Sequence, residues 1–365
     1  MSQDTERANT RPGDAPARPR WPAEWEPHVA TWLCWPKNPD TWPGVLGRVE
    51  SVFARMVEAL SPGEIVRILV DDAASEEHVR KLLQRERVDP DRGVEFFRVP
   101  SDDAWVRDHG PVYVFDEADG GAPWLIDFGF NAWGGKYPPW DRDLQVTGAI
   151  ADLTGGRRRA IDQVLEAGSI DGDGRGTVLT TESCLLNPNR TPDGRPRTRA
   201  AAESILRDAL GSEHVIWLGD GIVGDDTDGH VDDITRFVTP STIVTAVEPD
   251  PNDANHEPLR ANLERLRAAR DREGRAFEIV ELPMPPAVHF EGTRLPASHA
   301  NFYIANRVVL MPTFGQRSDA RAAAILGECF PGREIVGIPS RELVVGLGAV
   351  HCLTQQQPAV RGSRG

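Results

Sequence analysis

The feature that most constrains the fold of this chain is a recurring pattern: a β-rich run, a helix-like segment and a second β-rich run. The second β-rich run returns about every sixty residues, a longer period than the common solenoid repeats. Its five occurrences are "VEFFRVP", "QVLEAGS", "HVIWLGD", "FEIVELPMP" and "REIVGIPS". Alternation of strands and helices predicts an α/β fold rather than an all-β fold.

Two architectures agree with this alternation. A doubly wound open sheet is one of them. However, the loops after several units carry an acid, a histidine or a cysteine, and loops that converge on one axis would bring such residues together. The pattern therefore favours a closed radial arrangement of five α/β units. We expect helices near residues 75–85, 199–210, 257–270 and 319–329.

Length and composition indicate a globular protein. The 365 residues are 39% hydrophobic and 27% charged. Residues 1–20 are polar and rich in Pro and Ala, so we expect a disordered tail there and a single domain over residues 21–365. The tail has no apolar core of a secretory signal, and no later run approaches the roughly 18 apolar residues of a membrane helix. Cytoplasmic localisation is the default expectation.

The net charge of −15 argues against a nucleic-acid partner, because such proteins usually carry a basic face. It suits a cationic small molecule, although an acidic surface also serves solubility alone. The four cysteines are scattered and form no CxxC pair, which argues against a structural zinc site and a disulfide framework. We interpret Cys34, Cys184 and Cys329, which lie in apolar or mixed runs, as packed cysteines.

The stretch "GDDTDGHVDD" is the first candidate site. If it is extended, His230 and Asp232 point to the same face, and Asp228 joins them unless Gly229 makes a turn. A histidine and an aspartate on one face suit general acid–base catalysis, and they also suit a divalent metal. The alternative is a solvated acidic turn.

Two further stretches each contribute one acidic residue as a candidate for the site. In "DDAWVRDHGP", Asp108 can accept two N–H groups of a planar guanidinium, and Trp105 can stack on a cation. Arg107 and Asp108 are otherwise surface charges, and Trp105 an ordinary core residue. In "VLEAGS", Glu166 ends a β-like run, where it either leaves the core for solvent or lies in a cleft.

The stretch "GLGAVHCLTQQQP" places Cys352 beside His351. A nucleophilic cysteine needs a group that favours its thiolate. In a strand His351 points to the opposite face, so His230 is the better candidate for the partner of Cys352.

Eight ordered stretches resemble the agmatine deiminase and bacterial peptidylarginine deiminase family, over about residues 21–360. They are "WPAEWEPHVATWLCWP", "DAWVRDHGP", "FNAWGGKYPPWDRD", "LEAGSI", "GTVLTTESCLLNPNR", "GDDTDGHVD", "LPASHANFYIANRVVLMPTFG" and "HCLTQQQP". The resemblance implies the pentein fold, a five-bladed α/β propeller with pseudo-fivefold symmetry. It also implies a C–N hydrolase that converts a guanidinium group to a ureido group and releases ammonia, most simply agmatine to N-carbamoylputrescine, without metal or organic cofactor.

The resemblance assigns roles to five residues. Cys352 matches the nucleophile and His230 the general acid and base. Asp108 and Asp232 match the carboxylates that hold the guanidinium, and Glu166 matches the acid paired with the histidine. We also assign Trp105 and Gly348 to substrate binding. The partners we expect are a small cationic guanidine and further copies of the chain in a homo-oligomer, with no nucleic acid and no membrane.

The chain departs from the family pattern at Ala167, Leu347 and Ala349, where glycines are usual. We expect the last two to narrow the cleft beside Cys352, which affects the choice of substrate and not the reaction class. Another guanidine, such as peptidyl-arginine or a guanidino metabolite, stays an alternative. So does a metal-dependent hydrolase using Asp225, Asp226, Asp228 and His230. A non-catalytic guanidine binder would need neither Cys352 nor His230.

Overall fold

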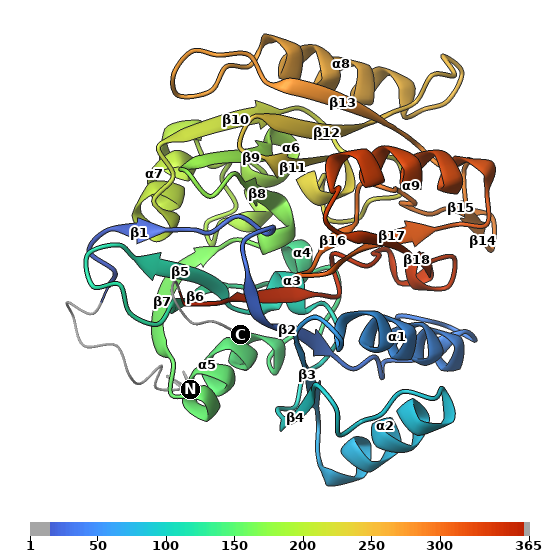
Figure 1. Ribbon diagram of the computed structural model, residues 1–365. Helices are drawn as coiled ribbons and strands as arrows, with labels where there is room; N and C mark the ends of the chain where they lie inside the picture. The colour runs from blue at the N-terminus through green and yellow to red at the C-terminus, as the bar shows by residue number, and fades with distance from the viewer. Residues whose placement is uncertain (1–14, 361–365) are drawn as a thin grey trace.

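A computed structural model describes residues 15–360. In this part of the chain, five sheets share one plan: an antiparallel first strand, then two parallel strands joined by a crossover helix (Figure 1). Parallel strands require such a crossover. The fold is therefore mixed α/β, as the sequence predicted. Within the described residues, no helix has both the length and the apolar composition needed to cross a membrane.

The first two units contain both the N-terminal and the C-terminal described strands. The first comprises β2 (His28–Cys34), α1 (Leu46–Leu60), β3 (Ile65–Val70), α2 (Ala73–Arg85), β4 (Val94–Arg98) and β19 (Gln355–Pro358). The second comprises β1 (Pro19–Arg20), β5 (Val112–Asp116), β6 (Trp124–Gly129), α5 (Asp143–Thr154) and β7 (Arg157–Val164). Because β19 pairs with β2, the end of the described chain completes the first sheet.

The other three units follow the same order. The third has β8 (Ile170–Gly172), β9 (Thr177–Thr181), α7 (Arg199–Leu210) and β10 (His214–Leu218). The fourth has β11 (Thr235–Thr239), β12 (Thr242–Val247), α8 (His256–Ala268) and β13 (Glu278–Pro283). The fifth has β16 (Tyr303–Ile304), β17 (Val308–Thr313), α9 (Arg317–Cys329) and β18 (Glu334–Pro339).

Short elements occupy the connections between units. They are α3 (Val106–His109), α4 (Ala132–Gly135), α6 (Glu182–Leu185), a hairpin of β14 (His289–Phe290) and β15 (Thr293–Arg294), and the 3₁₀ turns η1 (Ala167–Ser169), η2 (Pro188–Arg190), η3 (Val231–Asp233) and η4 (Leu343–Gly346). In Figure 1 the crossover helices α5, α7, α8 and α9 lie at the periphery, whereas α3 and α4 lie toward the middle.

Local sequence signals explain the crossover helices. The buried residues of α1 recur at spacings of three and four, as one face of a helix requires: Val49, Val52, Phe53, Met56, Val57 and Leu60. For α7, the Thr198 side chain accepts the N–H of Ala201 at 3.2 Å, and Gly211 ends the helix at φ +75°. Gly211 adopts this left-handed conformation without the steric cost that a side chain brings.

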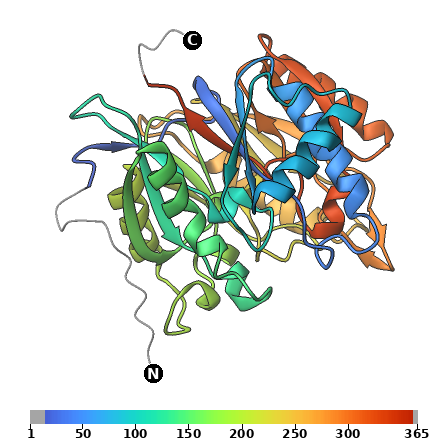
Figure 2. The same cartoon turned by 90° about the horizontal axis from the view of Figure 1, so that it is seen from below.

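Neighbouring units pack against one another. Helix α8 contacts β10, α9 contacts β13, α1 contacts β18, α7 contacts β1, and β19 contacts β5. These contacts link each unit to the next and link the fifth unit back to the first. One buried hydrophobic cluster is shared by the first and fifth units. It contains Phe53 and Val57 of α1 together with Leu310 and Ile338 of the fifth unit. Figure 2 shows α1 and α9 on the same side of the molecule.

Two sequence expectations need correction. The first predicted unit, with its helix at 75–85, corresponds to β3, α2 and β4, which extend the first sheet, whereas the crossover that matches the other units is α1. In addition, Pro19–Arg20, assigned to the tail, form β1 and pair with β5. Residues 1–14 of the predicted tail lie outside the described residues.

Candidate active site

Connections after the first, third and fifth units, together with the segments after β2 and β6, line one cleft of about 720 Å³. Of the predicted catalytic residues, Asp108 and Cys352 line it, whereas Glu166, His230 and Asp232 are fully buried. Cys352 lies on the segment between η4 and β19. Asp108 comes from α3, Glu166 from the connection between β7 and β8, and His230 and Asp232 from the start of η3. The cleft is also lined by Trp105, Trp133, Tyr137, Asp226, Leu347 and Gly348. Four separate connections thus supply the five catalytic residues that the sequence predicted.

Cys352 is almost fully buried, with 5% of its surface exposed. Its Sγ is 3.7 Å from Oδ2 of Asp232 and accepts a hydrogen bond from the Asn301 side chain at 3.2 Å. Burial raises the pKa of the Cys352 thiol well above its usual range, and the charges of Asp232, Asp233 and Asp108 raise it further. The isolated site therefore holds a thiol, and a cation must arrive before the thiolate is favoured.

His230 is completely buried at the start of η3. Its backbone N–H donates to Asp225 at 3.1 Å and to Thr227 at 3.0 Å, which fixes the turn before the imidazole. Burial lowers the pKa of His230, but the Asp108 carboxylate, 3.8 Å from Nδ1, together with Cys184 and Asp232, outweighs burial, and the pKa lies well above its usual value. The imidazole is thus charged and suits a general acid.

We predicted that alternation along an extended strand places His230 and Asp232 on the same face. That reason was wrong, although the two side chains do lie close together. The stretch is a 3₁₀ turn and not an extended strand. Asp228 has φ +68° and Gly229 φ +102°, so the chain turns before His230. Asp228 faces away from the group and pairs with Arg190 and with Lys136.

Gly168 shows how tightly the site residues converge. A Cβ on Gly168 would lie 2.6 Å from Nδ1 of His230, 2.8 Å from Oδ1 of Asp108 and 3.1 Å from Oδ2 of Asp232. Real Cβ atoms do not approach so closely, so any larger residue here would displace the site. The neighbouring Ala167, where the family usually has glycine, is buried in the third unit's core and leaves Gly168 in place.

Asp108 and Asp232 accept hydrogen bonds from different kinds of donor. Asp108 accepts the indole N–H of Trp133 at 3.0 Å and the backbone N–H of Gly168 at 3.1 Å. Burial raises the pKa of Asp108 to about 6. Burial also acts on Asp232, but a hydrogen bond from His351 and its charge outweigh burial, and the pKa of Asp232 lies below its usual value.

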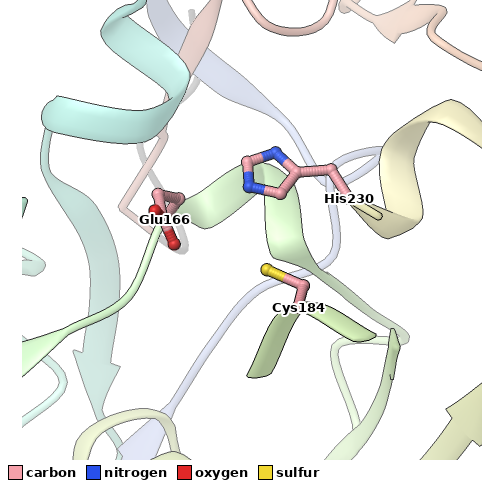
Figure 3. Close-up of side chains that lie close together, drawn as sticks. All are labelled: Glu166, Cys184 and His230. Atoms are coloured by element: carbon pink, nitrogen blue, oxygen red, sulfur yellow. The ribbon is translucent and has the colours of Figure 1, made fainter. Parts of the chain in front are cut away.

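Glu166 is buried and paired with a cation. Its Oε1 accepts the Nε–H of Arg190 at 2.8 Å, while Oε2 has no hydrogen-bond partner among residues 15–360. A nitrogen of His230, a carboxylate oxygen of Glu166 and the sulfur of Cys184 lie within 4.8 Å of one another (Figure 3). Within the described residues the imidazole makes no hydrogen bond to Glu166, so their pairing stays a prediction.

The same three side chains are the group within the described residues with the donor types of a metal site. They differ from the set Asp225, Asp226, Asp228 and His230 that the metal-hydrolase alternative requires. Asp228 of that set is already bound by Arg190, Lys136 and Asn189. Cys184, predicted to be a packed cysteine, is indeed buried in the third unit's core, but its sulfur also faces His230.

The two residues assigned to substrate binding line the cleft. Trp105 packs in the core with Trp42 and Trp133 and presents one edge to the cleft. A Cβ on Gly348 would lie 2.5 Å from the Trp105 ring, so a glycine is required there. Leu347 lines the cleft as expected, whereas Ala349 is buried in a satellite core and does not narrow it.

Sequence reasoning missed four residues that support the site. They are Glu24, Trp133, Arg190 and Asn301. Each lies within a stretch on which the family resemblance rested, and their contacts cross between units. The available signal for these four residues was a side chain able to form hydrogen bonds inside such a stretch.

The comparisons with known proteins agree on the family. Residues 20–358 match the family model described as Porphyromonas-type peptidyl-arginine deiminase. The chain belongs to this family. The agmatine deiminase of Pseudomonas aeruginosa (strain LESB58) is 40% identical to it, over 94% of this chain and 96% of that protein.

Solved structures point the same way. An agmatine deiminase of Enterococcus faecalis is 34% identical with a TM-score of 0.85, over 93% of this chain and 96% of that chain. A cysteine-to-serine variant of the C. jejuni agmatine deiminase with substrate bound is 27% identical with a TM-score of 0.83, over 95% of this chain and 97% of that chain. The resemblance to the deiminase family that the sequence indicated is thereby confirmed.

Proposed function

We propose that this chain hydrolyses agmatine to N-carbamoylputrescine and ammonia. The observation that carries the proposal is the convergence of His230, Asp108 and Asp232 around Gly168, with Cys352 3.7 Å from Asp232 and lining the same cleft as Asp108. The names of the 40%-identical and 34%-identical relatives support agmatine as the substrate. The net charge of −15 favours the approach of a dication.

Substrate binding requires the two carboxylates. A guanidinium carbon is a weak electrophile, because three nitrogens share its charge. Asp108 and Asp232, each accepting N–H groups of the planar cation, would hold it against Cys352. Such positioning can contribute roughly 7–11 kcal/mol toward lowering the barrier. The cation also opposes the burial and the carboxylate charges that keep Cys352 a thiol.

The reaction follows in two halves. When the cation binds, the thiol of Cys352 loses its proton to solvent, and the thiolate attacks the guanidinium carbon to form a tetrahedral adduct. The bond from that carbon to one nitrogen breaks as His230 donates a proton, and ammonia leaves. A water then attacks the amidino-cysteine with His230 as base, and the carbon–sulfur bond breaks to give the ureido product and the free thiol. Glu166 would favour the charged imidazole.

The test is ammonia release from agmatine, arginine, an arginine peptide and guanidinobutyrate. We expect agmatine to be the best substrate and Cys352→Ala to abolish turnover while retaining some binding. Cys34→Ala, at another buried cysteine, should keep activity. Normal ammonia release by Cys352→Ala would refute the mechanism, and a preference for the arginine peptide would establish the alternative substrate.

The same assay separates the metal-dependent alternative. A metal hydrolase loses activity with a chelator, whereas a cysteine deiminase loses it with iodoacetamide. We expect full activity after chelation and none after alkylation. Loss of activity on chelation, restored by a divalent metal, would contradict the proposal.

We also infer that the five units close into the five-bladed propeller of the pentein fold. The support is the cycle of contacts that leads from each unit to the next and back to the first. Such a ring explains why connections from separate units meet at one cleft. The single domain over residues 21–365 and the homo-oligomer stay predictions.

A further inference from the structure

His351 lies between two buried carboxylates. Its Nδ1 is 2.6 Å from Oδ2 of Asp232, and its Nε2 is 2.8 Å from Oε2 of Glu24. The side chain is 2% exposed, with 0% for Asp232 and 5% for Glu24. His351 is the residue before Cys352, and the two side chains flank the same aspartate, since Sγ of Cys352 is 3.7 Å from that Oδ2.

Both contacts can be hydrogen bonds only if both ring nitrogens carry a proton. Ionised carboxylates only accept hydrogen bonds, and a neutral imidazole donates from one nitrogen. The geometry therefore requires the imidazolium form of His351. Arg107 contacts the same Oε2 of Glu24 at 3.3 Å, whereas Oε1 pairs with Arg236 at 3.0 Å and accepts the N–H of Ile304 at 2.8 Å.

Charges consequently alternate from the interior toward the cleft: two arginines, Glu24, His351 and Asp232. A carboxylate buried among other acids tends to take up a proton. The titratable and charged groups around Asp232, besides His351, are His230, Arg236, Cys352, Asp108, Asp225 and Asp233. Asp171 is the other carboxylate that acts on His351.

The contact also orients Asp232. His351 holds Oδ2, whereas Oδ1 is buried and has no hydrogen-bond partner among the described residues. One oxygen of Asp232 is thereby fixed and the other is left to accept from a guanidinium. On the basis of the proposed function, we propose that Glu24 and His351 form a positioning pair, which keeps Asp232 ionised and turns Oδ1 toward the substrate.

The first test reads the protonation of His351 directly, without substrate. Wild-type protein carrying ¹⁵N-labelled histidine should show an imidazolium set, with both ring nitrogens protonated, that belongs to His351. His351→Gln identifies this set by removing it, which separates it from the signals of His28 and His299, whose ring nitrogens also each face an acceptor. A spectrum in which His351 carries one ring proton would overturn the proposal.

The second test is kinetic and uses a matched histidine. His351→Gln and Glu24→Gln should lower kcat/KM for agmatine by about 10- to 100-fold, mainly through KM. Each variant loses a charged hydrogen bond of the pair that orients Asp232, the carboxylate that accepts from the substrate. The acidic limb of the pH profile should steepen in His351→Gln, because Asp232 then titrates together with Asp108. His299→Gln is the control: His299 is as buried and bonds Asp319 at 3.0 Å.

Equal kinetics and equal pH profiles of His351→Gln and His299→Gln would overturn the proposal. Circular dichroism shows whether each variant folds. If His351→Gln does not fold, Glu24→Gln and the wild-type histidine spectrum decide the question. If the wild type releases no ammonia from any of the four guanidines, the proposed function fails, and the spectrum still decides whether Glu24 and His351 form the charged pair.

Discussion

Asp108 and Asp232 flank the same thiol, but their surroundings are opposite. Asp108 lies at the cleft and accepts hydrogen bonds from two neutral donors, the indole of Trp133 and the backbone of Gly168. Asp232 is fully buried and accepts a hydrogen bond from the imidazole of His351. His351 in turn contacts Glu24, which pairs with two arginines. The pKa of Asp108 is raised to about 6 by burial, whereas the pKa of Asp232 is lowered.

The difference indicates a division of labour. The protein itself supplies the positive charge that keeps Asp232 ionised. For Asp108 much of that charge must come from the substrate, so binding of a guanidinium lowers the pKa of Asp108 and is linked to proton release. The fixed carboxylate orients the cation and the adaptable one responds to its presence. Each of the following substitutions tests this difference between Asp108 and Asp232.

Replacing the fixed carboxylate should have the largest effect. Asp232→Asn removes the carboxylate that accepts a hydrogen bond from His351. It also removes one of the two carboxylates that hold the substrate. Removing one partner of a buried charge pair with a ligand costs about 2–5 kcal/mol of binding, so we expect kcat/KM for agmatine to fall by about 1000-fold at pH 8. Steady-state kinetics measures this loss.

Asp233→Asn is the matched control for that change. Burial first, and then the charges of Asp232 and Asp225, raise the pKa of Asp233 well above its usual range, so this neighbour takes up a proton more readily than Asp232. The amide should therefore replace it with little effect. A comparable loss of activity in both variants would mean that Asp232 has no special role.

Replacing the adaptable carboxylate should weaken activity yet stabilise the fold. The folded pKa of Asp108 is about 6, above its unfolded value of 3.8. Its stabilising contribution is therefore present below about pH 4 and is lost as the pH rises through 6. At pH 8, Asp108→Asn removes the cost of burying this charge but also removes the carboxylate beside the charged His230, so the free energy of unfolding should rise by less than about 3 kcal/mol. Urea unfolding at pH 8 and at pH 4 checks this difference.

The difference between the wild type and Asp108→Asn should vanish near pH 4, where both carry a neutral side chain. In the wild type, kcat/KM should fall as the pH drops below about 6, because the substrate needs the ionised form. Equal stabilisation at both pH values would show that Asp108 does not titrate as inferred.

Removing one neutral donor should shift the titration of Asp108 without abolishing it. Trp133→Phe removes the indole N–H that Asp108 accepts at 3.0 Å. A hydrogen bond to a charged group contributes about 1.5–3 kcal/mol, so the acidic limb of kcat/KM should move up by at least about one pH unit. Trp35→Phe, which removes a 3.0 Å bond to Glu50, is the control and should leave the limb in place.

The sequence predicts the strands and helices of this fold better than its site geometry. Long apolar runs such as 308–313 match β17, because a buried parallel strand needs continuous apolar residues. The first strands of the third and fifth units were not predicted, since β8 has three residues and β16 two, too few to show a period. The family resemblance named Cys352, His230, Glu166, Asp108 and Asp232, which the structure brings close together, and their roles stay predictions.

The resemblance could not give what surrounds them. The turn before His230 depends on Asp225 and Thr227 capturing a backbone N–H, which an alternation rule does not represent. The contact of His351 with Glu24 joins residues 327 positions apart. Such pairings follow from how the units pack and are not encoded in local spacing.

A change in the cleft wall that touches neither carboxylate should have the smallest effect. Leu347 lines the cleft with φ +69°, a conformation that costs a side chain about 1–2 kcal/mol. Leu347→Gly should remove that strain and the side chain's bulk, whereas Leu347→Ala removes only the bulk. Because glycine also adds entropy to the unfolded chain, we expect a net change in unfolding free energy within about 1 kcal/mol.

Both variants should admit bulkier guanidines, with kcat/KM for an arginine peptide rising by about tenfold at most. The acidic limb for agmatine should stay where the wild type has it, because Asp108 and Asp232 keep their donors. A gain in Leu347→Gly alone would assign the effect to backbone strain, and a gain in both would assign it to the width of the cleft. A shifted limb in either variant would show that the wall and Asp108 are coupled, and the contrast between the two carboxylates would then depend on more than their hydrogen-bond partners.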